Sequence, residues 1–295
     1  MTLKQALQNL KSNQALLHYN IATFEQFKAG IEAVQETRIP LIFGASEGER
    51  KYLDTKNIKF WVGEAQNRGL PVFINADHCK SVESSKEAID NLFDSVLFDL
   101  TSEKQNDLNN NILRTKEVKS FEESSRTKND NKEILIEGEI GYLPGSSDIG
   151  GTVELDEKNF TKPEDAENFL QQTGVDLLAI SVGNIHGIPA INSMQIDFER
   201  IKDIYERTQQ FKLFSGLVLH GGSGLTDKDF KNAIKNGIKI VHINTEFRKI
   251  WRDSLLRELQ AETVVPYKIL NGVISSLRER IVHYQKLFLS NNLVN

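Results

Sequence analysis

Val218-Leu219-His220-Gly221-Gly222-Ser223-Gly224-Leu225 is the stretch that decides the fold we expect for this chain. It reads as a buried apolar strand that ends in a histidine, followed by a glycine-rich turn into a helix. Two other apolar stretches end in a similar way, one at Asp77-His78 and one at His186. In a closed parallel barrel the carboxyl ends of all strands meet on one face. We therefore expect three imidazoles to converge there and to bind a metal ion that keeps one coordination position open for a substrate.

Eight apolar segments alternate with helical segments along the chain. The predicted strands are residues 15–20, 40–45, 71–76, 95–99, 133–140, 175–180, 213–220 and 238–244. The predicted helices are residues 3–12, 24–37, 52–68, 81–92, 103–131, 163–173, 198–211, 227–236 and 245–261. Such alternation indicates a parallel α/β fold, and a count of eight favours a closed (β/α)8 TIM barrel over an open sheet. We expect one barrel domain over residues 1–295, with residues 264–290 as an amphipathic helical extension that braces the barrel or pairs with a second subunit.

The composition excludes several classes of protein. The chain has 295 residues, a net charge of −5 and one cysteine, so no disulfide forms within it. Lysine and arginine are spread out, which argues against a nucleic-acid partner. Neither a signal peptide nor an apolar run long enough to span a membrane is visible. We expect a cytoplasmic protein with no membrane partner.

Several carboxylates lie close to the predicted metal site. Asp77 is a natural proton-transfer group beside a dication; the alternative is that it caps the helix that begins near Ser81. Glu137 and Glu139 share one face of the fifth strand by the period of two. If that face is the barrel interior, a cation is their obvious partner; otherwise they form an ordinary polar ridge. Asp99 ends the fourth strand and could join them.

Glycine-rich segments suggest where a phosphate binds. Residues 221–224 open a helix after the seventh strand, and Asn244-Thr245 opens one after the eighth. Backbone N–H groups at such helix starts suit a phosphate, and these two loops are the frequent phosphate site of this barrel. Residues 141–151 form the longest loop-like stretch and are a candidate mobile lid. Three histidines lie outside the predicted set: we expect His242 to point away from the site, and both it and His283 to be structural, while His18 does not fit the pattern.

Together these residues resemble the class II, metal-dependent fructose-bisphosphate aldolase family over nearly the whole chain. The stretches that carry the resemblance are Asn75–His78, Glu137–Gly141, Gly183–Gly187, Leu219–Gly224 and His242–Glu246, with weaker matches at His18–Asn20 and Ala45–Gly48.

The resemblance implies roles for individual residues. His78, His186 and His220 would bind the catalytic zinc, with another divalent cation as the alternative metal and a monovalent cation as an additional one. Asp99 and Glu139 would hold a displaced metal or orient the site. Asp77 would exchange a proton with the C4 hydroxyl, and Asp148, or second to it Glu154, would protonate the carbanion. The remaining implied contacts are Ser46 with the substrate, and Gly187, Gly221, Ser223, Asn244 and Thr245 with its phosphate.

The implied reaction is the reversible cleavage of a ketose bisphosphate through a zinc-stabilised ene-diolate. Fructose 1,6-bisphosphate would give dihydroxyacetone phosphate and glyceraldehyde 3-phosphate, in glycolysis and gluconeogenesis. The resemblance also implies a homodimer or a higher homo-oligomer.

The sequence departs from the family pattern after Gly187. A lysine often follows there in the family, whereas this chain has Ile188-Pro189-Ala190-Ile191. This departure favours one alternative, an aldolase for another phosphorylated ketose. Two more stay open: an aldolase for tagatose 1,6-bisphosphate, which differs from the fructose substrate only at C4, and a metal-binding barrel without turnover. The candidates for holding the distal phosphate are Arg248, Arg252, Arg278 and Arg280.

Overall fold

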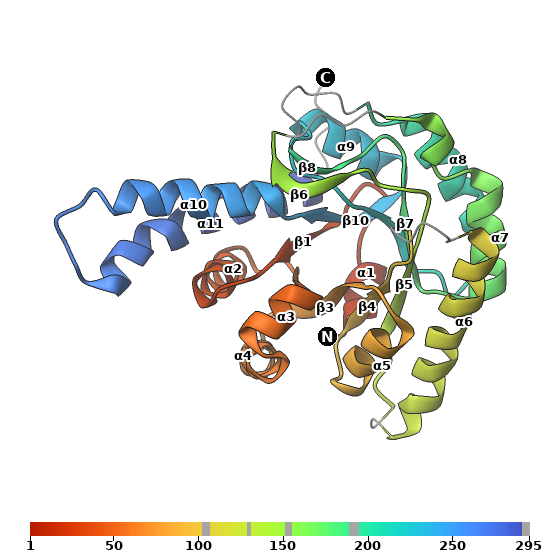
Figure 1. The fold of residues 1–295 in the computed structure, drawn as a ribbon, viewed down its shortest axis with the longest axis horizontal. Coiled ribbons are helices and arrows are strands. Elements are labelled where there is room, and N and C mark those ends of the chain that lie inside the picture. Colours follow the sequence, from red (N-terminus) through yellow and green to blue (C-terminus); the bar gives the residue numbers. More distant parts are fainter. Residues whose placement is uncertain (102–106, 129–130, 151–154, 189–194, 291–295) are drawn as a thin grey trace.

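The computed structural model describes residues 1–101, 107–128, 131–150, 155–188 and 195–290. Eight parallel strands close into a barrel in the order β1-β10-β9-β7-β5-β4-β3-β2, which confirms the predicted TIM barrel (Figure 1). The barrel strands are β1 Leu16–Asn20, β2 Leu41–Ser46, β3 Val72–Cys79, β4 Ser95–Phe98, β5 Leu135–Ile140, β7 Leu177–Ile180, β9 Gly216–Leu219 and β10 Ile238–Ile243.

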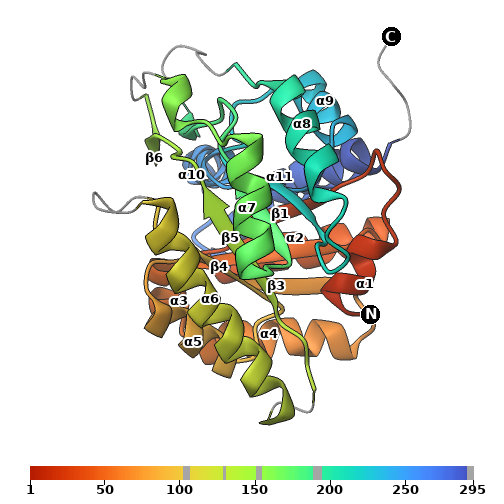
Figure 2. The ribbon, with the colours of Figure 1, turned by 90° about the vertical axis from the view of Figure 1, so that its right-hand side faces the viewer.

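Helices surround the barrel. They are α1 Leu3–Gln8, α2 Phe24–Thr37, α3 Glu47–Leu53, α4 Thr55–Asn67, α5 Val82–Asp90, α6 Leu108–Ser125, α7 Pro163–Thr173, α8 Phe198–Thr208, α9 Asp227–Lys235, α10 Thr245–Glu258 and α11 Pro266–Leu289. Figure 2 shows α5, α6 and α7 packed side by side along one flank. The predicted C-terminal extension is α11, which packs against α2 and α10 and projects with α10 beyond the barrel (Figure 1). Across the described ranges, none of the helices combines the length and the apolar character needed to cross a membrane.

The segment between β2 and β3 differs from the prediction. Instead of one helix over residues 52–68 there are two, because the chain turns at Asp54, whose φ is 64°. The first of them, α3, already begins at Glu47. Ser46 caps it by accepting from the Glu49 N–H, while the Glu49 carboxylate accepts from the Ser46 N–H at 2.8 Å. This reciprocal capping box explains why the helix begins where a stop to the strand was expected.

The predicted loop over residues 141–151 contains a strand, so that prediction was wrong in part. β6 Gly145–Ile149 pairs in parallel with β8 His186–Ile188 to form a small second sheet. Gly145 has a φ of 104°, and a Cβ there would lie 2.4 Å from the carbonyl oxygen of His186. Glycine is therefore required for the close approach of the two strands. Through this sheet the segment after β5 fixes the backbone of His186.

The barrel interior changes from apolar to polar along the strands. Its floor is an apolar layer closed from below by α1, made of Leu16, Ile42, Phe73, Leu135, Leu177, Val218 and Ile240 together with Leu3, Ala6 and Leu7. Because side chains alternate across a strand, the next inward residue lies two positions further on. Those residues are mostly polar and include His18, Asn75, Glu137, His220 and His242, all of them buried. The chemistry of the molecule is thus concentrated at the carboxyl end of the barrel.

Candidate active site

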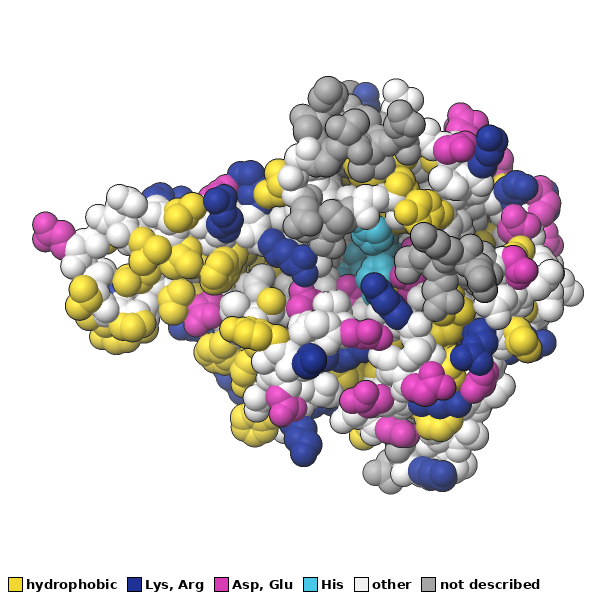
Figure 3. Space-filling view, viewed as in Figure 1, with side chains coloured by type: hydrophobic (Ala, Val, Ile, Leu, Met, Phe, Trp, Pro, Cys, Tyr) yellow, Lys and Arg dark blue, Asp and Glu magenta, His cyan; other side chains and the backbone are white. Residues whose placement is uncertain are grey.

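A pocket opens at the carboxyl ends of the strands. Its lining residues are Asn20, Ser46, Asp77, His78, His186, Gly187, His220, Gly221, Ser223, His242, Asn244, Thr245 and Arg248. Histidine side chains are visible at the bottom of this hollow in Figure 3. The structure therefore brings together the three predicted metal-binding histidines, Asp77, the predicted substrate contact Ser46 and the predicted phosphate contacts Gly187, Gly221, Ser223, Asn244 and Thr245. An adjoining pocket shares Ser46, His78 and His186 and adds Asp99.

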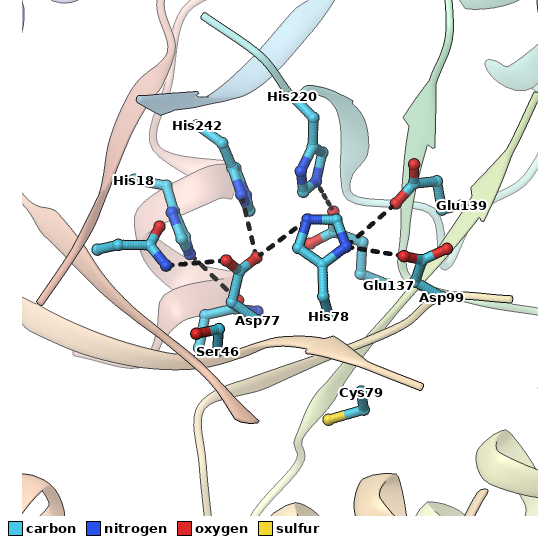
Figure 4. Close-up of polar contacts among 12 residues, drawn as sticks. His18, Ser46, Asp77, His78, Cys79, Asp99, Glu137, Glu139, His220 and His242 are labelled. Carbon is cyan, nitrogen blue, oxygen red and sulfur yellow. Dashed lines mark hydrogen bonds and ion pairs between the residues drawn. The ribbon is translucent and has the colours of Figure 1, made fainter. Parts of the chain in front are cut away.

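His78 lies at the end of β3, where its backbone φ of 48° turns the chain. Because of this turn, the adjacent Asp77 and His78 both reach the site, as expected. His78 Nδ1 lies 2.9 Å from Asp99 Oδ2 and 3.7 Å from Glu139 Oε2 (Figure 4). Its Nε2 is left facing Asp77, at 3.9 Å from Oδ1. A carboxylate on one nitrogen and a free second nitrogen is the usual arrangement of a metal-binding histidine.

His220 also has a carboxylate on one of its ring nitrogens. Its Nε2 is hydrogen-bonded to Glu137 Oε1 at 2.9 Å, which leaves Nδ1 as the available ligand atom. The ring of His78 lies 5.1 Å from that of His220 and 5.3 Å from that of His186, measured between centroids. Ligand atoms of Asp77, His78 and His220 lie within 4.8 Å of one another. His186 belongs to no such close group among the described residues, although it lines the same pocket.

The donor set fits a divalent cation. Four buried carboxyl groups surround the histidines: Asp77, Asp99, Glu137 and Glu139. Asp77 Oδ1 and Glu139 Oε2 are both buried without a hydrogen-bond partner. Buried oxygens without partners are costly, and a bound cation would satisfy them. Glu137 and Glu139 thus face the barrel interior and do not form a surface ridge.

The pKa values reflect this crowding of negative charge. Burial alone would lower the pKa of His78, but Asp77, Asp99 and Glu139 raise it to about 10. Burial raises the pKa of Glu139 to about 8, with Asp99 adding to the shift. For Asp99, burial acts upward, but the hydrogen bond with His78 brings its pKa down to about 2. The carboxylates thus outweigh the positive charge of the protonated His78, which is an arrangement that attracts a cation.

Asp77 is placed for proton transfer. Asp77 lines the pocket; its Oδ2 accepts from Asn20 Nδ2 at 2.9 Å, and its Oδ1 is buried without a hydrogen-bond partner. Burial opposes its ionisation, but His78 holds the pKa of Asp77 well below its usual range, so the group is an ionised carboxylate with room to accept a proton. The alternative role as a helix cap is wrong, because Ser81 caps α5 by accepting from the Ser84 N–H.

The glycine-rich segments form a cradle beside the histidines. Gly221 has a φ of 64°, and a Cβ there would lie 2.1 Å from the carbonyl oxygen of Ile185. Ser223 Oγ accepts from the Glu246 N–H at the start of α10. Asn244 is the N-cap of α10, yet its side chain makes no capping hydrogen bond. N–H groups at a helix start such as this one, next to Gly221 and Thr245, are suitable donors for an anion such as phosphate.

Sequence reasoning missed part of the site. His242 was expected to point elsewhere, which is wrong: its Nδ1 lies 3.5 Å from Asp77 Oδ1 and its ring 3.8 Å from that of His220. It faces inward because it lies two residues after the inward Ile240. The His18 ring stacks on the His242 ring from the neighbouring strand β1, with centroids 3.4 Å apart. His283, by contrast, pairs with Asp227 on the surface, as a structural residue would.

Other predicted residues have different outcomes. Of the four arginine candidates, Arg248 lines the pocket, whereas Arg280 is bound to Glu246 at 2.6 Å. The backbone of Asp148 belongs to β6, but its side chain lies outside the described part of the structure, as do Glu154 and residues 189–194.

Comparisons with known proteins agree with this geometry. The sequence model of the class II fructose-bisphosphate aldolases matches residues 1–293. A fructose-bisphosphate aldolase of Staphylococcus aureus is 30% identical over 304 aligned residues, covering 99% of this chain and 98% of that protein. A 6-phospho-5-dehydro-2-deoxy-D-gluconate aldolase of Bacillus licheniformis is 29% identical, covering 98% of this chain and 94% of that protein.

A solved structure shows the same architecture. The YdjI aldolase of Escherichia coli K12 superposes with a TM-score of 0.78 at 25% identity, covering 99% of this chain and 98% of that one. These matches make the chain an aldolase, that is, a carbon–carbon lyase. It belongs to the class II fructose-bisphosphate aldolase family.

Proposed function

We propose that this protein is a zinc-dependent aldolase that reversibly cleaves fructose 1,6-bisphosphate to dihydroxyacetone phosphate and glyceraldehyde 3-phosphate. The observation that carries the proposal is the grouping of His78, His220 and the ionised Asp77 beside a cradle of helix-start N–H groups. A metal, a base and a phosphate site are the three parts that such a cleavage needs.

His78 Nε2, His220 Nδ1 and the imidazole of His186 would hold the metal. Three histidines with one open position are typical of catalytic zinc. Asp99, Glu137 and Glu139 orient the rings and carry negative charge toward the ion. A bound zinc ion supplies Lewis-acid stabilisation of the negative charge that develops when the carbon–carbon bond breaks.

Asp77 accepts the proton of the substrate C4 hydroxyl. As that proton leaves, the C4–O bond becomes a carbonyl and the C3–C4 bond breaks, with its electron pair staying on C3. The aldehyde is the first product. Asp148 is the proposed donor of the proton that C3 then takes up to give dihydroxyacetone phosphate. In the reverse direction the same two groups exchange their roles.

The phosphate next to the ketone would bind at Gly187, Gly221, Ser223, Asn244 and Thr245, and Ser46 would contact the substrate from β2. Arg248 is the arginine that lines the pocket and is therefore our choice for a second phosphate. The absence of a lysine after Gly187 favours a second candidate, an aldolase acting on another phosphorylated ketose. The related enzyme of Bacillus licheniformis, named for a different phosphorylated substrate, supports keeping it. Tagatose 1,6-bisphosphate differs from fructose 1,6-bisphosphate only at C4.

A coupled cleavage assay tests the proposal. The protein is stripped with a chelator, reloaded with zinc or another divalent cation, and offered each bisphosphate, with and without a monovalent cation. We expect activity to disappear with the chelator, to return with zinc and to be absent in His220→Ala. Bound metal without cleavage of either bisphosphate would shift the choice to another phosphorylated ketose. A protein that binds no metal would contradict the proposal.

We also propose a homo-oligomer, most simply a homodimer, in the cytoplasm, serving glycolysis and gluconeogenesis. The projecting pair α10 and α11 supports this, because apolar side chains are exposed on and between these helices (Figure 3). They are Leu256, Leu259, Val264 and Tyr267. Exposed apolar groups of this kind mark association surfaces. Light scattering after gel filtration measures the mass, and a monomer at micromolar concentration would contradict the oligomer.

A further inference from the structure

Glu49 is a buried carboxylate next to the site whose position helix capping alone does not explain. Its side chain is only 7% exposed. The glutamate of a capping box needs to reach only the N–H of the cap residue, so capping does not require this degree of burial. Glu49 makes that bond with Ser46 at 2.8 Å and accepts from two further side chains. Asn20 Nδ2 donates to Oε2 at 3.0 Å, and Arg248 donates to Oε1 at 2.8 Å. Four elements, β1, β2, α3 and α10, are therefore joined at one carboxylate.

Asn20 links Glu49 to the base. Its amide nitrogen donates to Asp77 Oδ2 at 2.9 Å as well as to Glu49 Oε2, so both of its N–H groups are used. Because two carboxylates accept from one NH2 group, the amide is fixed in orientation and rotation. Asn20 is 2% exposed, so water does not compete for these bonds. Asp77 is therefore held by Oδ2, and its Oδ1 is left without a hydrogen-bond partner.

Glu49 also has a cationic partner. Arg248 Nη2 lies 2.8 Å from Glu49 Oε1. Charge-assisted hydrogen bonds of this kind are shorter and stronger than neutral ones, and they define position more tightly. Because the acceptor at residue 49 is a carboxylate and not a neutral group, it holds the Asn20 amide by a strong hydrogen bond on the side away from Asp77.

We propose that Glu49 is a positioning residue for the proton-transfer step, acting on Asp77 through Asn20. The proposal rests on the proposed aldolase function, in which Asp77 accepts the C4 hydroxyl proton. Without Glu49 the Asn20 amide can rotate, and Asp77 Oδ1 drifts from the position at which it meets that hydroxyl. Displacements of about 1 Å in such groups cost on the order of 100-fold in rate.

Two reactions of the same active site separate positioning from general damage. Cleavage of fructose 1,6-bisphosphate needs Asp77 at the C4 hydroxyl. Exchange of the C3 hydrogen of dihydroxyacetone phosphate with deuterium from D2O needs the metal, the phosphate cradle and the C3 proton donor, but it has no C4 hydroxyl to deprotonate. A residue that acts through Asp77 therefore affects the first reaction and spares the second.

The experiment compares the zinc-loaded wild type with Glu49→Ala, Glu49→Gln, Asn20→Ala and the double variant of Glu49→Ala with Asn20→Ala. We expect kcat for cleavage to fall about 30- to 100-fold in both alanine single variants, with deuterium exchange and metal content within threefold of wild type. The double variant should be no slower than either single variant, because both substitutions remove one linkage. Glu49→Gln keeps the size and one acceptor oxygen, so it should lose less and folds even if Glu49→Ala does not.

Asp229→Ala is the matched control. Asp229 completes the capping box of α9 with Thr226, so this variant removes an equivalent helix cap that has no link to Asp77. It should lower the midpoint of thermal unfolding without changing cleavage. The inference is overturned if Glu49→Ala cleaves like wild type, if cleavage and exchange fall together, or if the losses multiply in the double variant. A wild type that neither cleaves the bisphosphate nor exchanges deuterium would overturn the proposed function itself.

Discussion

Replacing Gly44 with alanine tests how tightly the polar layer of the barrel is packed. Gly44 lies on β2 opposite Asn20 of β1 and faces the interior. A Cβ there would lie 2.1 Å from Cε1 of His18, 2.6 Å from its Nε2 and 3.0 Å from Asn20 Oδ1. The His18 ring cannot simply retreat, because it is stacked on His242 at 3.4 Å and its Nε2 donates to Asn75 at 3.1 Å. We therefore expect the added methyl group to displace both His18 and Asn20.

The magnitude follows from the contacts. An ordinary carbon–carbon contact requires the His18 ring to move by about 1 Å or more. Overpacking of a well-filled interior costs about 1–3 kcal/mol of the free energy of unfolding. Because the same methyl group pushes on Asn20, which holds Asp77, we also expect kcat for cleavage to fall about 10- to 100-fold. Gly44 has no positive φ, so none of this loss comes from backbone strain.

Urea unfolding and the cleavage assay measure the two effects. Gly63→Ala is the control, because Gly63 lies within α4 with no heavy atom within 4 Å of the position of a new Cβ. It should gain about 0.5–1 kcal/mol from helix propensity and leave activity unchanged. If Gly44→Ala were as stable and as active as wild type, the reasoning about a rigid His18–His242 stack would be refuted.

Three further predictions concern other buried charges. Asp176→Ala should lower the free energy of unfolding by about 3–5 kcal/mol in urea titration, because it leaves the buried Lys119 ammonium, 2.6 Å from that carboxylate, without its closest partner; a loss below about 1 kcal/mol would contradict this. Burial lowers the pKa of Lys59 to about 8, so at pH 7 the folded protein bears a desolvation cost that the unfolded chain does not. Lys59→Met should therefore be more stable than wild type at pH 7 by about 1–3 kcal/mol, and the difference should shrink as pH rises from 8 toward the ordinary lysine pKa; a constant difference across that range would argue against burial as the cause. Asp99→Asn should weaken zinc binding about 10- to 100-fold in a chelator competition, because His78 Nδ1 loses the carboxylate that orients the ring; unchanged affinity would show that Asp99 has no part in holding the metal.

The sequence was informative wherever a local pattern determines the structure. Strand and helix periodicity predicted all eight barrel strands to within a few residues, because each strand is a short apolar run between polar turns. The strand-end histidines could be placed together because the topology of a parallel barrel leaves no other arrangement. The start of α3 was missed although its signal is present: Ser46 followed three residues later by Glu49 is a capping box.

Contacts between distant segments had no such signal. Glu49 and Arg248 are 199 residues apart in sequence, and nothing near either residue predicts their pairing. The pairing of β6 with β8 likewise depends on where two segments meet above the barrel. His242 is a different case. Counting in steps of two from the inward Ile240 would have placed the His242 ring inside the barrel. The sequence therefore held the information needed to predict this position.

The buried carboxyl groups link the stability of the fold to the metal. Glu137 and Glu139 must face inward, since the alternation of β5 ties their direction to that of the inward Leu135 in the apolar floor. Burial raises the pKa of both groups, that of Glu139 to about 8, so the metal-free barrel holds protons there near neutral pH. A divalent cation favours the ionised carboxylates, and its binding therefore releases protons and becomes tighter as pH rises. Because the unfolded chain has no such cluster, the free energy of metal binding adds to the free energy of unfolding. The polar layer would thus be the part of the barrel through which a bound metal adds to stability.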